Sequence, residues 1–447
     1  MDSTPKAKPP RNWKRIALIA SAAALVSALG VGAWARSALD TARSDVADDR
    51  IALAEVKITD KAAVRRGEYV MRAADCAACH NGARGEFAGG YPFDTDFGTI
   101  LSSNITPDRQ TGIGAMTERD FFDAVRHGQG SKGFLYPAMP YTAYAKLTDR
   151  DMHDLWAYMS TVKPVSNAVN ENGGMIFPFS MRLAMAGWDM LFYDRKPLAA
   201  TPGKSPEWER GRYLVDGGGH CSACHTPRNL LGAESAGYYL QGGRIGYWYA
   251  PDLTGNDHFG LGKASVEEVA EYLKTGGDPT AIAAGPMAEA VEHSLQYLSD
   301  ADIKAMAVYL KSLPASEKQR PDAIPATSPA MKRAALRYEV NCSACHGVKG
   351  EGMGNMTPAF AGNQALQSDD ATSAIHVMLV GGRAASTHSK PTGAGMPSFA
   401  WKMDDRQIAE TLDCIRNSWG NAAKPVSESE VARMRKAMKA AENLPAN

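Results

Sequence analysis

The sequence has no excess of charge of either sign, because 49 lysines and arginines balance 49 aspartates and glutamates. It therefore lacks the broad basic field that would favour nucleic acid or acidic lipid as a partner. Cysteine is scarce, at seven in 447 residues, a number that alone could suggest disulfides or zinc. Beyond the N-terminal region, no run is apolar enough to cross a membrane. What the chain does is decided by where the few cysteines lie.

Six of the seven cysteines fall in three copies of Cys-x-x-Cys-His. Two thiols at this spacing can each form a thioether with one porphyrin, and the adjacent histidine can bind the iron from the proximal side. We therefore predict three covalently bound haem c groups. The attachment residues would be Cys76, Cys79, Cys221, Cys224, Cys342 and Cys345, with His80, His225 and His346 as axial iron ligands.

Zinc is the alternative for paired cysteines. A structural zinc site needs four ligands from neighbouring units. The first cysteines of successive pairs here are 145 and 121 residues apart, and each pair lies in its own repeat. This spacing favours haem over zinc.

Similar segments flank each haem motif. Short helical segments precede the motifs at residues 66–70, 210–214 and 332–336, the first two sharing Gly-x-Tyr. Longer ones follow at 148–159, 299–310 and 404–415, each with Ser, Thr or Asp in capping positions. Proline- and glycine-rich stretches near 196–206 and 313–329 separate the repeats. We expect an all-α protein of three tandem class I cytochrome c domains, at residues 60–165, 200–315 and 328–425, preceded by one N-terminal hydrophobic helix.

The N-terminus indicates the compartment. Five basic residues, Lys6, Lys8, Arg11, Lys14 and Arg15, precede an uncharged run from Ile16 to Ala35. At about 20 residues this run is long enough to span a bilayer, and the positive flank would stay in the cytoplasm. The end of the run also fits a small-x-small cleavage site. Residues 1–36 are thus predicted to be a signal peptide or a membrane anchor, and both readings place the haem domains on the periplasmic side of the bacterial cytoplasmic membrane.

One methionine lies at a matched place in each repeat. Met139, Met287 and Met396 follow their proximal histidines by 59, 62 and 50 residues, and each sits beside proline or glycine. Because methionine sulfur suits an electron-transfer haem, we predict these three as the sixth iron ligands. Methionine often only fills gaps in a core, and the chain has 20 of them. The competing residues, which have no matched counterparts, are Met116, Met353 and Met403.

Other residues receive plainer interpretations. We expect His220 to make a hydrogen bond in its loop and Cys414, the odd cysteine, to fill a place in a helical core. The segments 104–108 and 242–252 are expected to line haem edges, and they could be either ordinary turns or surfaces that face a partner. Five other histidines are interpreted as surface or hydrogen-bonded residues, namely His127, His258, His293, His376 and His388.

The chain resembles the tri-haem cytochrome c subunits of bacterial membrane-associated dehydrogenases, a group whose partners include alcohol, gluconate, sorbitol and fructose dehydrogenases and whose relatives serve molybdenum hydroxylases. The resemblance covers roughly residues 60–425. It rests on Asn-Ile-Thr-Pro at 104–107, Gly-Gly-His-Cys at 218–221, Cys-His-Thr-Pro-Arg at 224–228 and Ile-Arg-Asn-Ser-Trp-Gly-Asn at 415–421. Cys414 departs from the usual aromatic residue, and the N-terminal segment leaves membrane attachment open.

This resemblance implies an electron-transfer subunit with catalysis in a partner. The partner would be a dehydrogenase of the alcohol, sugar, sugar-acid or aldehyde class holding flavin, pyrroloquinoline quinone or molybdenum. Quinone or a terminal oxidase would accept the electrons. The alternatives are a free periplasmic shuttle and a haem enzyme in its own right, although matched methionines in all three repeats would leave no open iron.

Overall fold

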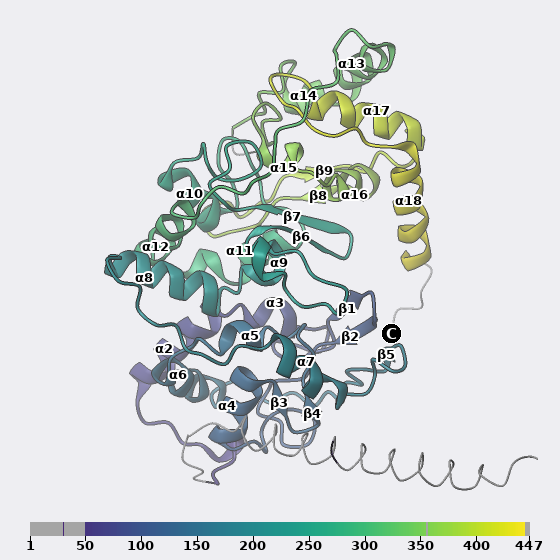
Figure 1. The fold of residues 1–447 in the computed structure, drawn as a ribbon. Helices are drawn as coiled ribbons and strands as arrows, with labels where there is room; N and C mark the ends of the chain where they lie inside the picture. The colour runs from purple at the N-terminus through teal and green to yellow at the C-terminus, as the bar shows by residue number, and fades with distance from the viewer. Residues whose placement is uncertain (1–29, 31–49, 355, 443–447) are drawn as a thin grey trace, which may run out of the picture.

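The computed structural model describes residue 30, residues 50–354 and residues 356–442 (Figure 1). Apart from Gly30, the predicted signal or anchor segment at 1–36 lies outside the described residues. Within the described part of the chain, no helix is both long and apolar enough to cross a bilayer.

Three pairs of crossing helices, stacked from bottom to top in Figure 1, organise the molecule. Each pair joins the helix before a haem motif to the helical segment that follows the motif in the same repeat. The pairs are α2 (Lys61–Ala73) with α6 (Asp149–Met159), α8 (Pro206–Tyr213) with α12 (Asp300–Lys311), and α13 (Pro329–Asn341) with α17 (Asp405–Arg416).

Small residues allow these crossings. A Cβ atom on Gly67 would lie 1.8 Å from the carbonyl oxygen of Asp154, and one on Gly211 would lie 1.9 Å from that of Ala305. The third pair carries the fully buried Ala334 on α13. The glycine of the Gly-x-Tyr motif is therefore explained by close approach of two helix backbones.

The closing helices begin where their capping residues predict. Thr148, Ser299 and Asp404 each accept a hydrogen bond from the backbone N–H three residues on. Such caps satisfy amide groups that a helix start leaves without partners. The predicted starts of all three closing helices are confirmed.

Further helices complete the fold. The haem motifs form the one-turn helices α3 (Cys76–His80), α9 (Ser222–His225) and α14 (Ser343–His346). A turn of π-helix, Leu214–Gly218, leads into the second motif. The others are α4 (Glu118–His127), α5 (Tyr141–Tyr144), α7 (Ala184–Phe192), α10 (Val266–Thr275), α11 (Pro286–His293), α15 (Gln364–Gln367), α16 (Thr372–Val380) and α18 (Glu428–Glu442).

The fold is helix-rich but not purely α, so that prediction is right only in part. A three-stranded antiparallel sheet forms from β1 (Pro92–Thr95), β2 (Gly98–Leu101) and β5 (Gly174–Met175). Two-stranded ribbons join β3 (Gln129–Gly130) with β4 (Gly133–Phe134), β6 (Gln241–Ile245) with β7 (Trp248–Asp252), and β8 (Gly382–Arg383) with β9 (Gly395–Met396). Strands of two to five residues let the long middle loops satisfy their backbone hydrogen bonds, and they are too short to give an alternating sequence pattern.

Separate apolar clusters lie beneath the helix pairs. Cys414 on α17 is 5% exposed and packs with Met331 and Ala334 of α13. The predicted core role of this cysteine is confirmed.

Candidate haem sites

The three motif histidines have the same local environment. His80, His225 and His346 are all buried, at 9% exposure or less. The Nδ1 atom of each lies against a backbone carbonyl oxygen: Ser103 at 2.8 Å, Pro251 at 2.7 Å and Pro358 at 3.2 Å. An imidazole that donates from Nδ1 to a carbonyl leaves the lone pair of Nε2 for a metal. The backbone thus selects the tautomer that a proximal haem ligand needs.

Burial lowers the pKa of all three histidines, because the charged imidazolium loses its hydration. The hydrogen bonds to the carbonyl oxygens oppose this effect without outweighing it. The neutral ring, which is the form that binds iron, is therefore favoured.

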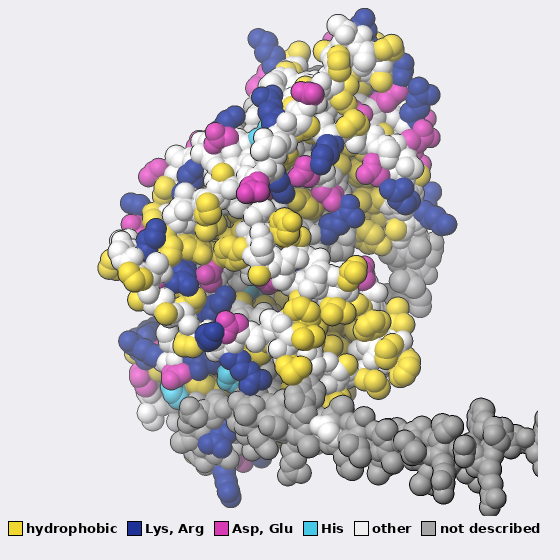
Figure 2. Space-filling view, viewed as in Figure 1, with side chains coloured by type: hydrophobic (Ala, Val, Ile, Leu, Met, Phe, Trp, Pro, Cys, Tyr) yellow, Lys and Arg dark blue, Asp and Glu magenta, His cyan; other side chains and the backbone are white. Residues whose placement is uncertain are grey.

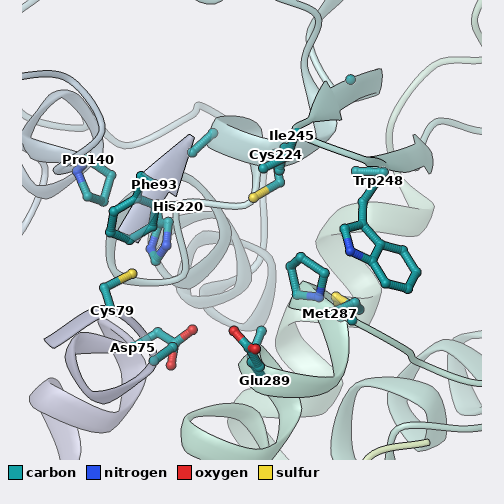
Figure 3. Close-up of a pocket in the computed structure, with 18 of the residues that line it drawn as sticks. Asp75, Cys79, Phe93, Pro140, His220, Cys224, Ile245, Trp248, Met287 and Glu289 are labelled. Atoms are coloured by element: carbon teal, nitrogen blue, oxygen red, sulfur yellow. The ribbon is translucent and has the colours of Figure 1, made fainter. Parts of the chain in front are cut away.

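All three motifs open into one continuous cavity of about 3320 Å³. Ordinary ligand pockets are about 300–1,000 Å³, so this space suits several large groups. All six motif cysteines and all three motif histidines line it. In the close-up of Figure 3, Cys79 and Cys224 direct their sulfur atoms toward the space between the first two sites. The residues present fit covalently held haem.

The three matched methionines line the same cavity but lie in different types of secondary structure. Met139 lies in the loop before α5, Met287 in the first turn of α11 and Met396 in β9. All three line the cavity. The predicted rigid loop is therefore found only for Met139, while a helix start and a short strand carry the others.

The competing methionines differ from one another. Met116 also lines the cavity, while Met353 is half exposed and Met403 is buried in the core near α17, both away from the cavity wall. Six further methionines that line the cavity were not considered as ligands from the sequence, because they have no matched places in the three repeats: Met159, Met175, Met185, Met306, Met356 and Met378.

The cysteines do not form a zinc site. A tetrahedral zinc site needs four ligands from neighbouring units. Among the described residues, no group of three or more His, Cys, Asp or Glu side chains could hold a metal ion.

His220 makes the predicted loop contact, with Nδ1 2.8 Å from the carbonyl oxygen of Gly218. It also lines the cavity, where its ring meets Tyr144 edge-on at 5.6 Å. His376 differs from the prediction. Its Nδ1 is buried without a hydrogen-bond partner, and its ring lies 4.3 Å from that of Trp248. The contact depends on how two repeats meet, which a local sequence pattern does not report.

The two distinctive segments form turns and short strands. Residues 242–252 form β6, β7 and their turn, and Asn104 bonds the carbonyl oxygen of Val165 at 2.8 Å and the backbone N–H of Thr106 at 3.0 Å. Both segments also line the cavity. Turn chemistry therefore shapes part of the wall around the haem sites.

Comparison with protein families defines the class. The cytochrome c family model matches residues 208–314 and 331–419, and the model for subunit III of cbb3-type cytochrome c oxidase matches residues 62–159. The chain is thus built from cytochrome c domains, which hold haem c covalently.

Relatives narrow the class to a family. The chain is 42% identical to the gluconate 2-dehydrogenase cytochrome c subunit of Pantoea cypripedii, over 86% of this chain and 92% of the relative. It is 40% identical to the fructose dehydrogenase cytochrome subunit of Gluconobacter japonicus (83% and 82%) and 37% identical to the cytochrome c subunit of the quinone alcohol dehydrogenase of Gluconobacter oxydans (86% and 84%). The chain belongs to this family of dehydrogenase cytochrome c subunits, and its function is electron transfer. The resemblance noted in the sequence is confirmed.

Proposed function

We propose that the chain carries three haem c groups in three tandem domains, at residues 60–165, 200–315 and 328–425. The three family-model matches and the three crossing helix pairs support this division. Thioethers would form at both cysteines of each motif, with His80, His225 and His346 as proximal ligands. The buried, carbonyl-bonded state of these histidines supports their role.

Met139, Met287 and Met396 are proposed as the distal ligands. Their support is the wall they share with the motif histidines, together with their matched places in the repeats. A bound haem c supplies a one-electron iron couple, which a methionine ligand shifts to higher potential. The protein holds each ring, orients the ligating imidazole and excludes water.

The proposed path starts at a dehydrogenase catalytic subunit of the alcohol, sugar, sugar-acid or aldehyde class, with flavin, pyrroloquinoline quinone or molybdenum. It passes through this chain to quinone or a terminal oxidase on the periplasmic side of the membrane. The observation that carries the proposal is the single cavity joining all three motifs. Groups placed along one continuous space can exchange electrons without a mobile carrier.

Gentle detergent extraction tests this function. The holoprotein would be purified from its membranes with whatever accompanies it, and haem would be counted by intact mass. The proposal expects three haems and a dehydrogenase whose substrate reduces them within the isolated complex. If the chain is recovered without a dehydrogenase, the result would favour the free shuttle or the haem enzyme.

A further inference from the structure

One face of the molecule is unusually apolar. Of the nineteen large apolar side chains that are exposed in the described residues, nine lie in two short segments, residues 176–191 and 230–231. Figure 2 shows apolar side chains gathered over the region of α7 and the β1–β2–β5 sheet. The nine are Ile176, Phe177, Phe179, Met181, Leu183, Met190, Leu191, Leu230 and Leu231. We call this set the α7 face.

The two segments form one surface. The indole N–H of Trp188 donates to the carbonyl oxygen of Leu231 at 2.9 Å, which fixes α7 against the 230–231 loop. Phe179 packs on Phe97 of the β1–β2 turn with ring centroids 4.7 Å apart. Apolar groups this exposed and this concentrated mark an interaction site on a soluble domain.

The charged side chains within residues 174–193 point into the protein and not out of the α7 face. The only charged residues between 174 and 193 are Arg182 and Asp189. Arg182 bonds the carboxylate of Glu171 at 2.6 Å and the carbonyl oxygen of Phe134 at 3.0 Å. Asp189 is 5% exposed and accepts from the hydroxyl of Tyr141 at 2.6 Å. The outer surface of residues 174–193 consequently offers thioether, aliphatic and aromatic groups, while the exposed carboxylates of Asp94 and Asp96 lie on the neighbouring β1–β2 hairpin.

We propose that the α7 face lies on the membrane, with these side chains inserted into the lipid; the proposal rests on the membrane location given above and deepens it. A protein interface carries roughly one hydrogen bond per 100–200 Å², and it needs polar groups that this segment has turned inward. With nine residues, α7 is far shorter than the ~20 needed to span a bilayer. It therefore suits a helix that lies in the interface.

The N-terminal apolar run also supports a membrane at the α7 face. The apolar run Ile16–Ala35 precedes Arg50, where continuous description begins, and the residues between could span at most about 50 Å when fully extended. The described chain then enters the first repeat, where the backbone N–H of Leu53 bonds the carbonyl oxygen of Met116 at 2.8 Å. That repeat also supplies the β1–β2 edge of the α7 face. A retained run would therefore hold this face near the bilayer.

A membrane at the α7 face would affect how a quinone, the proposed electron acceptor, reaches the haem sites. Leu191, Leu230 and Leu231 belong to the α7 face and also line the haem cavity. A bilayer covering this face would thus border the rim of the cavity, and a quinone dissolved in lipid would approach the haem sites there without crossing water.

Lipid photocrosslinking tests the proposal directly. The full-length holoprotein would be reconstituted in vesicles of phosphatidylethanolamine and phosphatidylglycerol that contain a diazirine phospholipid, and labelled peptides would be mapped by mass spectrometry. We expect label on peptides covering 174–193 and 229–232. The position of the label reports on this face whether or not the N-terminal segment is retained.

A matched pair of variants completes the design. One replaces Phe177, Met190, Leu191 and Leu230 by Gln; the control replaces four exposed apolar residues elsewhere, Leu336, Val340, Val380 and Trp401, by Gln. Label on the α7 peptides should fall by about tenfold or more in the first variant and stay unchanged in the control. Intact mass and absorption spectra confirm that both hold their haems.

Absence of label on the α7 peptides, when vesicles are labelled elsewhere, would overturn the proposal. So would crosslinks from the native complex that join these peptides to a catalytic subunit. Substrate-driven haem reduction, measured in the same preparations, reports separately on the electron-transfer function, so failure of either idea is distinguishable from failure of the other.

Discussion

Tyr69 on α2 donates a hydrogen bond from its hydroxyl to Asp302 Oδ2 at 2.6 Å, at the start of α12 in the next repeat. The same hydroxyl accepts from the backbone N–H of Ser299 at 2.9 Å. Tyr213 on α8 returns the contact, donating to Asp151 and accepting from the backbone N–H of Thr148 at 3.1 Å. The tyrosines of the two Gly-x-Tyr motifs thus join the first and second repeats by a reciprocal exchange.

Removing one of these hydroxyls should loosen the junction. Tyr69→Phe or Tyr213→Phe leaves a partly buried carboxylate short of a partner, and we expect each to lower the free energy of unfolding by about 1 kcal/mol. The measurement is denaturant unfolding followed by circular dichroism. Tyr238→Phe, at a 59% exposed tyrosine, is the control. Equal stability of all three variants would contradict the role assigned to the junction.

A second prediction concerns Gly285, two residues before Met287. Its φ of 56° and ψ of −138° lie where side chains are strained, and a Cβ there would be 2.4 Å from the indole of Trp248. Gly285→Ala should therefore cost about 2 kcal/mol of unfolding free energy and alter the spectrum of one haem. Gly187→Ala is the matched control, since nothing lies within 4 Å of its Cβ position. If both alanine variants change the free energy of unfolding by the same amount, the backbone conformation of Gly285 and its contact with Trp248 do not restrict this position.

Methionine variants test the distal ligands one at a time. Met139→Ala, Met287→Ala and Met396→Ala should each remove about one third of the weak methionine–iron absorption band of the oxidised protein and lower one haem potential. All three haems should stay attached by their thioethers. Met116→Ala is the control within the same cavity wall. A full band in any of the three variants refutes that ligand.

Acid should weaken the third helix pair. Burial alone would raise the pKa of Glu410, but hydrogen bonds from Arg333 and Arg337, both at 2.5 Å, outweigh it and lower the pKa to about 2. Between about pH 4.5 and pH 2 the unfolded chain binds a proton that the folded chain does not, so the stability present above this window is lost as pH falls through it.

Glu410→Gln should remove that dependence. Near neutral pH the variant should be less stable than the native protein, and its unfolding free energy should change less between neutral pH and about pH 3. Denaturant unfolding at the two pH values gives both quantities, with Asp96→Asn as an exposed control. A parallel decline of native protein and variant would show that Glu410 does not carry the effect.

The haem chemistry was predictable because it depends on residues close together in the sequence. A Cys-x-x-Cys-His turn places two thiols and an imidazole on one helical turn whatever surrounds it, and Thr148, Ser299 and Asp404 cap their helices by local bonds. The matched places of Met139, Met287 and Met396 predicted three distal ligands, and the structure places all three in the wall of one cavity.

Features that depend on docking between repeats were not predictable. The contact of Trp248 with His376 joins two repeats, and the hydrogen bonds from Tyr69 to Asp302 and from Tyr213 to Asp151 join residues 233 and 62 positions apart. In the third repeat, Tyr338 instead donates to the carbonyl oxygen of Gly347 at 2.6 Å within its own unit, although the sequence places a tyrosine in a similar position. Periodicity reports which side chains are buried, and it does not report which neighbour they meet.

The continuous hollow that joins the three motifs also bears on how the protein is made. A void of this size would cost the bare polypeptide much of the packing that stabilises a native interior, so haem attachment supplies part of the energy of folding. In the proposed tri-haem form, each thioether is made from a reduced thiol, so the haems would be attached before the helices close around them. The cofactor would then stabilise the interior of the protein as well as carry its electrons.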